Sequence, residues 1–209
     1  MSAALGSLLH RIAVIERDVG DRFPLYADPA DGRWTTTRRG SWTGGFWAGL
    51  LWLRASLSGA AADHETALAW SQRLLPRVGD DTDTRAMTFW YCAGTPHRWT
   101  VDPRAAAVAL AGAEAVAASA LPGSGIVAVG TAFSDGPPRI GIDALAATVA
   151  LLDHAGMPDA AAVHARGAAA LLVDADGTVI THSDLDVTDG DRQAPGNRPG
   201  IPAGCRWPG

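Results

Sequence analysis

Lysine is absent from this chain of 209 residues, so all 17 basic residues are arginines. The absence excludes a Schiff-base lysine, a pyridoxal-phosphate lysine and the lysine of a phosphate-binding P-loop. Glutamate is scarce as well: Glu16, Glu65 and Glu114 are its only occurrences, and the other carboxylates are the short side chains of aspartate. The formal net charge of −5 provides no basic surface for nucleic acid.

Cysteines are few, and long apolar runs are missing. Cys92 and Cys205 have neither metal-site nor disulfide spacing, and the six histidines are scattered without zinc spacing. No run approaches the roughly 20 apolar residues that span a bilayer. His10 and Glu16 interrupt the N-terminal apolar pattern, which argues against a signal peptide. We therefore expect a cytoplasmic protein that binds no nucleic acid, membrane, metal or cofactor.

Tryptophan, in contrast, is abundant and clustered. Seven of the eight tryptophans lie between Trp34 and Trp99. In the segment 41–52, Trp42 lies on a glycine-rich turn and two further tryptophans on the apolar stretch that follows. Indole faces in loops suit the flat faces of sugar rings, which indicates a saccharide ligand. The alternative is that these side chains simply fill a core.

Apolar periodicity predicts a mainly helical chain. The expected helices cover residues 3–20, 44–58, 62–77, 84–93, 103–120, 143–155 and 158–173, with short extended pieces at 126–129 and 179–181. Asp63, Asp102 and Asp143 are expected to cap helices, and Gly156 to end one. Successive antiparallel helix pairs favour an all-α fold, either an α/α toroid or a helical-repeat solenoid.

The C-terminal stretch has a different character. From residue 184 onward the sequence is rich in Asp, Gly, Pro and Arg and has no apolar periodicity. We therefore expect a helical domain over residues 1–183 and an irregular tail over 184–209. Its aspartates do not have the ligand spacing or the closing glutamate of a calcium loop, so we expect no calcium site; they are Asp184, Asp186, Asp189 and Asp191.

Four segments resemble one enzyme family, in the same order along the chain. The segments 41–52, 82–89, 142–145 and 181–186 resemble the unsaturated glucuronyl hydrolases and the related unsaturated rhamnogalacturonyl hydrolases. The resemblance implies an (α/α)6 toroid that acts on the unsaturated uronic acid at the end of a saccharide. It also implies vinyl-ether hydration: a carboxylic acid protonates the C4=C5 double bond, water adds at C5, and the hemiketal opens and releases the aglycone.

The resemblance assigns roles to particular residues. Asp143 matches the family's acid/base position, and Asp83 is the candidate for the second carboxylate. The match at Asp83 is imperfect: aligning Ala86 with the family's glycine puts Thr84 at the acidic position, and Thr82 stands where the family has a histidine. The alternative for Asp143 is a helix N-cap, which would hold an ionised carboxylate and oppose an acid role.

The resemblance also points to residues that contact the substrate. Trp42 matches a tryptophan of the sugar site, and His182 matches a histidine near the substrate, although an exposed loop histidine is an equally good interpretation. A uronate carboxylate suits a guanidinium, for which Arg85, Arg38 and Arg139 are candidates. An exposed, solvated position is the alternative for each of these arginines.

The resemblance covers residues 20–192, about half to two-thirds of a family member, which indicates a truncated form. We expect its last helix pair to expose apolar faces, with marginal stability or self-association and with low or absent activity. Two alternatives remain beside a hydrolase of unsaturated uronyl saccharides. One is a helical scaffold that binds a protein partner, and the other is a saccharide-binding remnant without catalysis.

Overall fold

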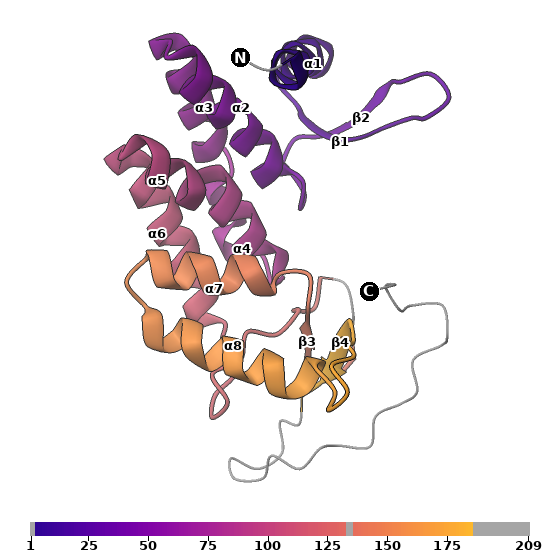
Figure 1. Ribbon diagram of the computed structural model, residues 1–209, viewed down its shortest axis with the longest axis vertical. Helices are drawn as coiled ribbons and strands as arrows, with labels where there is room; N and C mark the ends of the chain where they lie inside the picture. Colours follow the sequence, from indigo (N-terminus) through magenta and orange to yellow (C-terminus); the bar gives the residue numbers. More distant parts are fainter. Residues whose placement is uncertain (1–2, 133–135, 186–209) are drawn as a thin grey trace. The chain divides into compact units, whose positions relative to one another are not determined.

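The structure, a computed structural model, describes residues 3–132 and 136–185. Most of these residues are helical (Figure 1). They divide into two compact units, which are described separately below. Unit 1 comprises Met1–Gly79 and Met87–Gly112, and unit 2 comprises Asp80–Ala86 and Ala113–Gly209. None of the described helices is long and apolar enough to cross a membrane.

Unit 1 is built around a helical hairpin. The helices α2 and α3 lie side by side and are joined at Gly59 (Figure 1). A Cβ on Gly49 of α2 would lie 2.8 Å from the carbonyl oxygen of Tyr91, so glycine allows this close backbone approach. The described elements with residues in this unit are α1 (Ala3–Val19), β1 (Phe23–Ala27), β2 (Trp34–Thr37), α2 (Gly44–Ser58), α3 (Ala61–Gln72), a 3-10 turn (Leu75–Gly79), α4 (Thr84–Phe89), a π-helical turn (Trp90–Gly94), α5 (Thr95–Thr100) and α6 (Pro103–Ala118).

Several tryptophans fill the core of unit 1. Trp47, Trp52 and Trp70 are all buried, and Trp70 makes edge-on contacts with Trp47 and Phe23. The indole Nε1 of Trp52 donates a hydrogen bond to the Ser71 hydroxyl at 2.9 Å. The core interpretation is therefore correct for these three residues, and the density of tryptophan in the sequence does not by itself indicate a ligand site.

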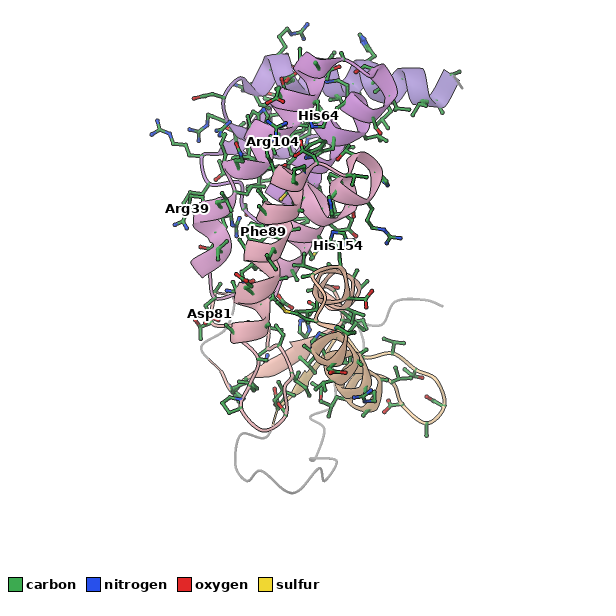
Figure 2. All side chains as sticks on the ribbon, turned by 90° about the vertical axis from the view of Figure 1, so that its left-hand side faces the viewer. Arg39, His64, Asp81, Phe89, Arg104 and His154 are labelled. Carbon is green, nitrogen blue, oxygen red and sulfur yellow. The ribbon has the colours of Figure 1, made fainter. Side chains whose placement is uncertain are left out.

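Asp102 caps α6 as its sequence position predicts. Its carboxylate accepts a hydrogen bond from the backbone N–H of Arg104 at 2.7 Å. The same carboxylate contacts His64 Nε2 at 2.7 Å and the Arg104 guanidinium at 2.9 Å. Hydrogen bonds from Arg104 and His64 hold the pKa of Asp102 well below its usual range. His64 and Arg104 are labelled at the top of Figure 2.

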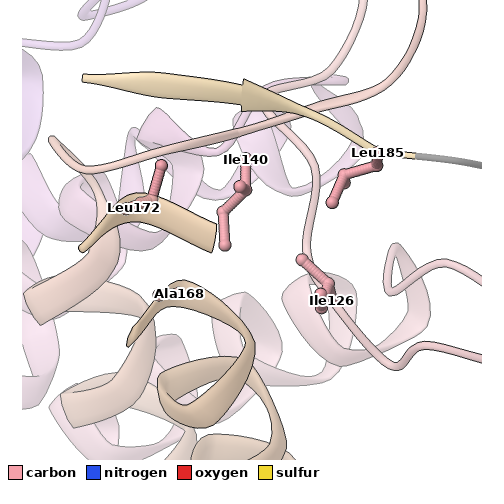
Figure 3. Packing of buried hydrophobic residues seen from close by; sticks show 5 residues of the cluster. All are labelled: Ile126, Ile140, Ala168, Leu172 and Leu185. Atoms are coloured by element: carbon pink, nitrogen blue, oxygen red, sulfur yellow. The ribbon is translucent and has the colours of Figure 1, made fainter. Parts of the chain in front are cut away.

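Unit 2 combines a second helical hairpin with a two-stranded sheet. The helices α7 (Leu145–His154) and α8 (Pro158–Leu172) pack side by side (Figure 1). The strands β3 (Arg139–Gly141) and β4 (His182–Asp184) pair in antiparallel register. A buried cluster lies beneath them (Figure 3) and consists of Ile126, Ile140, Ala168, Leu172 and Leu185.

Most of the expected helices are present, but several details differ. The third and fourth expected helices end early, at Gln72 and Phe89, and continue as 3-10 and π-helical turns. The hairpin β1–β2 and the short helix α5 were not expected. The expected extended pieces contain no strand and contribute only the isolated bridges Ala120–Val127 and Val173–Val179. Gly156 follows α7 with a positive φ of 78°, as expected for a helix end.

Two of the expected caps are wrong. The residue that caps α3 is Ala60, and Asp63 lies inside the first turn. The Asp63 carboxylate instead accepts a hydrogen bond from Ser58 at 2.6 Å and pairs with Arg54 at 3.0 Å. At α7 the capping residue is Ala144, without a side-chain cap, so Asp143 lies one residue before the helix cap. At α3, therefore, the Asp63 carboxylate is engaged by Ser58 and Arg54 and does not cap the helix.

Candidate active site

The segment before α4 carries the first candidate carboxyl, Asp83. Only 8% of Asp83 is exposed. Its backbone N–H donates to the carbonyl oxygen of Val129 at 3.0 Å, and the Thr82 hydroxyl accepts the N–H of Thr84 at 3.2 Å. The first of these bonds holds Asp83 against the segment around Val129 in the same unit, and the second is local to the turn.

Burial changes the acidity of this carboxyl. The pKa of Asp83 is raised from 3.8 to about 6, chiefly because burial disfavours the charged form. A hydrogen bond from the backbone N–H of Thr84 opposes the rise, and the negative charge of Asp143 adds to it. Asp143 therefore lies close enough for its charge to act on the Asp83 carboxyl, and the two residues form a carboxyl pair.

Asp143 differs from its partner because it is exposed. It follows β3 and precedes the capping residue of α7. The structure thus brings the two predicted catalytic residues together within unit 2. The buried Asp83 has an environment that retains a proton, while Asp143 is the member that faces solvent.

His182 lies on the exposed face of the β3–β4 sheet. It pairs with Gly141, which lies two residues before Asp143. A Cβ on Gly141 would lie 3.1 Å from Cδ2 of the His182 ring, so the ring rests on the glycine. Two residues further along the strands, Arg139 and Asp184 form another cross-strand pair, with a 2.8 Å contact between Nε and a carboxylate oxygen. The sheet therefore presents a polar face that includes His182.

The arginines have different surroundings. Arg85 is buried, and its guanidinium donates to the carbonyl oxygen of Asp80 at 2.8 Å and to the Ser119 hydroxyl at 2.7 Å. Burial also lowers its pKa. This geometry favours a role in holding the Asp83 segment, and substrate binding by Arg85 stays a prediction without support from its contacts. Arg139 is exposed beside Asp184, and Arg38 is an exposed residue of unit 1.

Trp42 belongs to unit 1 and is 46% exposed. It follows Ser41, whose φ of 43° is unusual for a residue other than glycine. Its ring makes an edge-on contact with Phe46 at 6.3 Å, and Phe46 stacks on Tyr91 at 4.5 Å. The exposed indole therefore ends a row of three aromatic rings, an arrangement that can accept a sugar face.

Candidate metal ligands do not cluster in the part of the chain that the structure describes. Within residues 3–132 and 136–185, no three His, Cys, Asp or Glu side chains gather in a way that could hold a metal ion. Of the aspartates weighed as a calcium loop, Asp184 lies in β4, and the other three lie outside the described residues.

Sequence reasoning missed the contacts that hold the Asp83 segment. The Asp81 carboxylate accepts hydrogen bonds from the backbone and the hydroxyl of Thr131, at 2.9 Å and 2.6 Å. These bonds lower the pKa of Asp81. The glycine at position 130, next to a residue with a hydroxyl, was the available signal for a close backbone approach, but nothing in the sequence links it to a site 50 residues earlier.

Comparison with known proteins gives the fold. No protein-family model matches the chain, and no curated protein matches it. The structure is similar to the crystal structure of an unsaturated glucuronyl hydrolase from Bacillus sp. GL1, with a TM-score of 0.72 and 23% identity over 90% of this chain. It is also similar to the enzyme from Streptococcus agalactiae, with a TM-score of 0.77, 18% identity and the same coverage. The chain has the fold of the unsaturated glucuronyl hydrolases.

The chain spans about half the length of the unsaturated glucuronyl hydrolases that it matches. The chain covers 53% of the Bacillus structure and 50% of the Streptococcus structure. A hydrolase of this kind described as specific for heparin also matches, with a TM-score of 0.74, 23% identity, and coverage of 88% of this chain and 50% of that one. The mainly helical structure agrees with the helical fold of these enzymes.

Proposed function

We propose that the protein hydrates the vinyl-ether double bond of saccharides that end in an unsaturated uronic acid. The observation that carries the proposal is the carboxyl pair of unit 2, in which Asp83 is buried with a pKa of about 6 and Asp143 is exposed. One carboxyl of such a pair still holds a proton close to neutral pH, which vinyl-ether protonation requires. The glucuronyl hydrolase fold supports the same chemistry.

The different exposure of Asp83 and Asp143 gives them different roles in the proposed reaction. Asp143 is the carboxyl that a saccharide can reach, and Asp83 keeps one proton in the pair because its own ionisation is disfavoured. In the proposed reaction the proton held by Asp83 passes to Asp143, which donates it to C4, and a water molecule adds through its oxygen to C5. Asp143, again a carboxylate, accepts one proton of that water, and this proton returns to Asp83, so the pair is restored. The hemiketal at C5 then opens and releases the aglycone.

Two exposed residues, one in each unit, are candidate substrate contacts. His182 pairs with Gly141, two residues before Asp143. We propose that His182 donates a hydrogen bond to the sugar. Trp42 is proposed as a stacking surface for a sugar ring because its indole is exposed. The substrate class follows the neighbours: one is described as degrading glycosaminoglycan, and another is named with the saccharide dGlcA-Glc-Rha-Glc.

The test is an absorbance assay with an unsaturated uronyl disaccharide from a glycosaminoglycan. Loss of the double-bond absorbance with the unmodified chain, abolished by Asp143→Asn, is the expected result. Asp83→Asn should abolish it too, because an amide cannot hold the proton of the pair. Asp153→Asn, which alters another aspartate of unit 2, is the matched control. Activity that survives Asp143→Asn would remove this residue from the mechanism.

A second candidate function is saccharide binding without catalysis. The exposed indole of Trp42, with Phe46 and Tyr91 behind it, favours this alternative. Equilibrium binding of the same disaccharide, measured by calorimetry, distinguishes the two functions. Binding that Trp42→Ala removes, in a chain without hydration activity, would support the binding function and contradict the enzymatic one.

A further inference from the structure

The residues before α4 are tied to a second segment of unit 2 by a compact set of contacts. Both the backbone N–H and the hydroxyl of Thr131 donate to one carboxylate oxygen of Asp81, at 2.9 Å and 2.6 Å. The backbone N–H of Ala132 donates to the carbonyl oxygen of Asp81 at 3.2 Å. Asp81 is thus held through its side chain and its backbone by two consecutive residues.

Glycine at position 130 allows a very close approach between the backbones of the two segments. Its φ is +85°, and a Cβ at this position would collide with the carbonyl oxygen of Asp81. A residue other than glycine would therefore push the segments apart. On the other side of Gly130, the carbonyl oxygen of Val129 accepts the backbone N–H of Asp83 at 3.0 Å.

The segment that carries Thr131 is itself well anchored. The backbone N–H of Val129 donates to the carbonyl oxygen of Arg139 in β3 at 2.8 Å. Two residues earlier, the N–H of Val127 donates to Nδ1 of the buried His164 at 3.3 Å. Since this segment is fixed to β3 and to α8, it offers a firm support against which the Asp83 segment is held.

We propose that Asp81, Gly130 and Thr131 form a clamp that keeps the Asp83 carboxyl away from water, which makes Thr131 a positioning residue for the reaction. The inference rests on the proposed function for its catalytic meaning, although the clamp itself is a property of the fold. Thr131 is exposed, so its two hydrogen bonds to Asp81 do not serve to satisfy a buried polar group. Instead, these bonds fix Asp81, which lies two residues before Asp83.

The clamp has a consequence for acidity that a general stabilising contact lacks. Burial is the main cause of the raised pKa of Asp83. A loosened clamp admits water to this carboxyl, and water favours the charged form, so the pKa of Asp83 should fall toward its ordinary value. A residue that only adds stability elsewhere in unit 2 would leave this pKa unchanged.

The experiment measures the titration midpoint of the Asp83 carboxyl by carbon NMR in the full chain, with Asp83→Asn used to assign the signal. Thr131→Val keeps the volume and removes the hydroxyl, and we expect the midpoint to fall from about 6 by about half a pH unit or more. Thr131→Ser keeps the hydroxyl and should restore the midpoint. Thr178→Val, a change of the same kind in a turn of unit 2 far from these contacts in sequence, should not move it.

An unchanged midpoint in folded Thr131→Val would overturn the clamp. Should that variant fail to fold, Thr131→Ala removes the same hydroxyl without an added methyl at its position, and the same two outcomes apply. The titration needs no substrate, so it tests the clamp even if the chain has no hydration activity. If activity is present, the pH profile of hydration should move in the same direction as the midpoint.

Discussion

Replacing Asp83 with asparagine should change how the stability of the protein depends on pH. Below pH 3.8 the carboxyl is protonated in both the folded and the unfolded chain, and above about 6 it is ionised in both. Between these values the folded state binds the proton more tightly. The stability that Asp83 contributes is therefore fully present below 3.8 and is lost as the pH rises through 6. Asparagine does not titrate, so the variant lacks this loss.

The magnitude follows from the two pKa values. A difference of about two pH units at about 1.4 kcal/mol each amounts to about 3 kcal/mol. The free energy of unfolding of Asp83→Asn, relative to the unmodified chain, should therefore rise by about 2 kcal/mol between pH 4 and pH 7, because part of the difference already develops below pH 4. Any hydrogen bond that asparagine makes or loses shifts the two curves by a constant and does not alter this slope.

The assay is urea denaturation at half-unit steps of pH, followed by circular dichroism. Asp176→Asn is the control, because Asp176 caps an exposed turn by accepting the N–H of Thr178. A stability difference between Asp83→Asn and the unmodified chain that stays constant from pH 4 to pH 7 would refute the reasoning. It would mean that the Asp83 carboxyl is hydrated in the folded protein.

The remaining predictions concern other residues. Burial lowers the pKa of His164 to about 4, so the stability that it contributes is present above 6.5 and is lost as the pH falls through 4. His164→Asn should remove a loss of about 3 kcal/mol in acid, opposite in sign to the effect at Asp83, and the same titration checks it. Ser71→Ala should lower the free energy of unfolding by about 1–3 kcal/mol, because the Trp52 indole and the Cys92 carbonyl oxygen lose a buried partner; denaturation with Ser7→Ala as control measures it. Asp102→Ala should cost about 1–2 kcal/mol or more through the lost cap of α6, and little change on denaturation would contradict that role. Self-association through the apolar face expected on the last helix pair predicts a mass that rises with concentration in light scattering, and a constant monomer mass would speak against it.

The helices were predictable from the sequence because their apolar side chains repeat with helical spacing over long stretches. The bounds of α2 agree with the prediction at both ends. The β1–β2 hairpin was not predictable, because its short strands carry no alternating pattern and pair through backbone groups. Asp63 shows the limit of cap signals, because its carboxylate binds Ser58 and Arg54 and does not cap α3.

The candidate site was predictable in part. The sequence identified Asp83 and Asp143 through a family resemblance, and the structure brings their charges within reach of each other. It did not indicate that Asp83 is the buried member, because burial depends on contacts with residues such as Val129 that lie far along the chain. The clamp residue Thr131 was missed for the same reason. Local patterns specify helices, whereas the acidity of a carboxyl depends on its three-dimensional surroundings.

Leu185 has a practical consequence for anyone who shortens this protein. Its side chain completes the buried cluster that includes Ile140 and Leu172, and its backbone N–H donates to the carbonyl oxygen of Pro138 at 2.7 Å. The change of composition in the sequence would suggest truncating the protein after residue 183. Such a truncation removes Leu185 and leaves a cavity under the β3–β4 sheet. Limited proteolysis should accordingly spare the peptide bond that precedes Leu185.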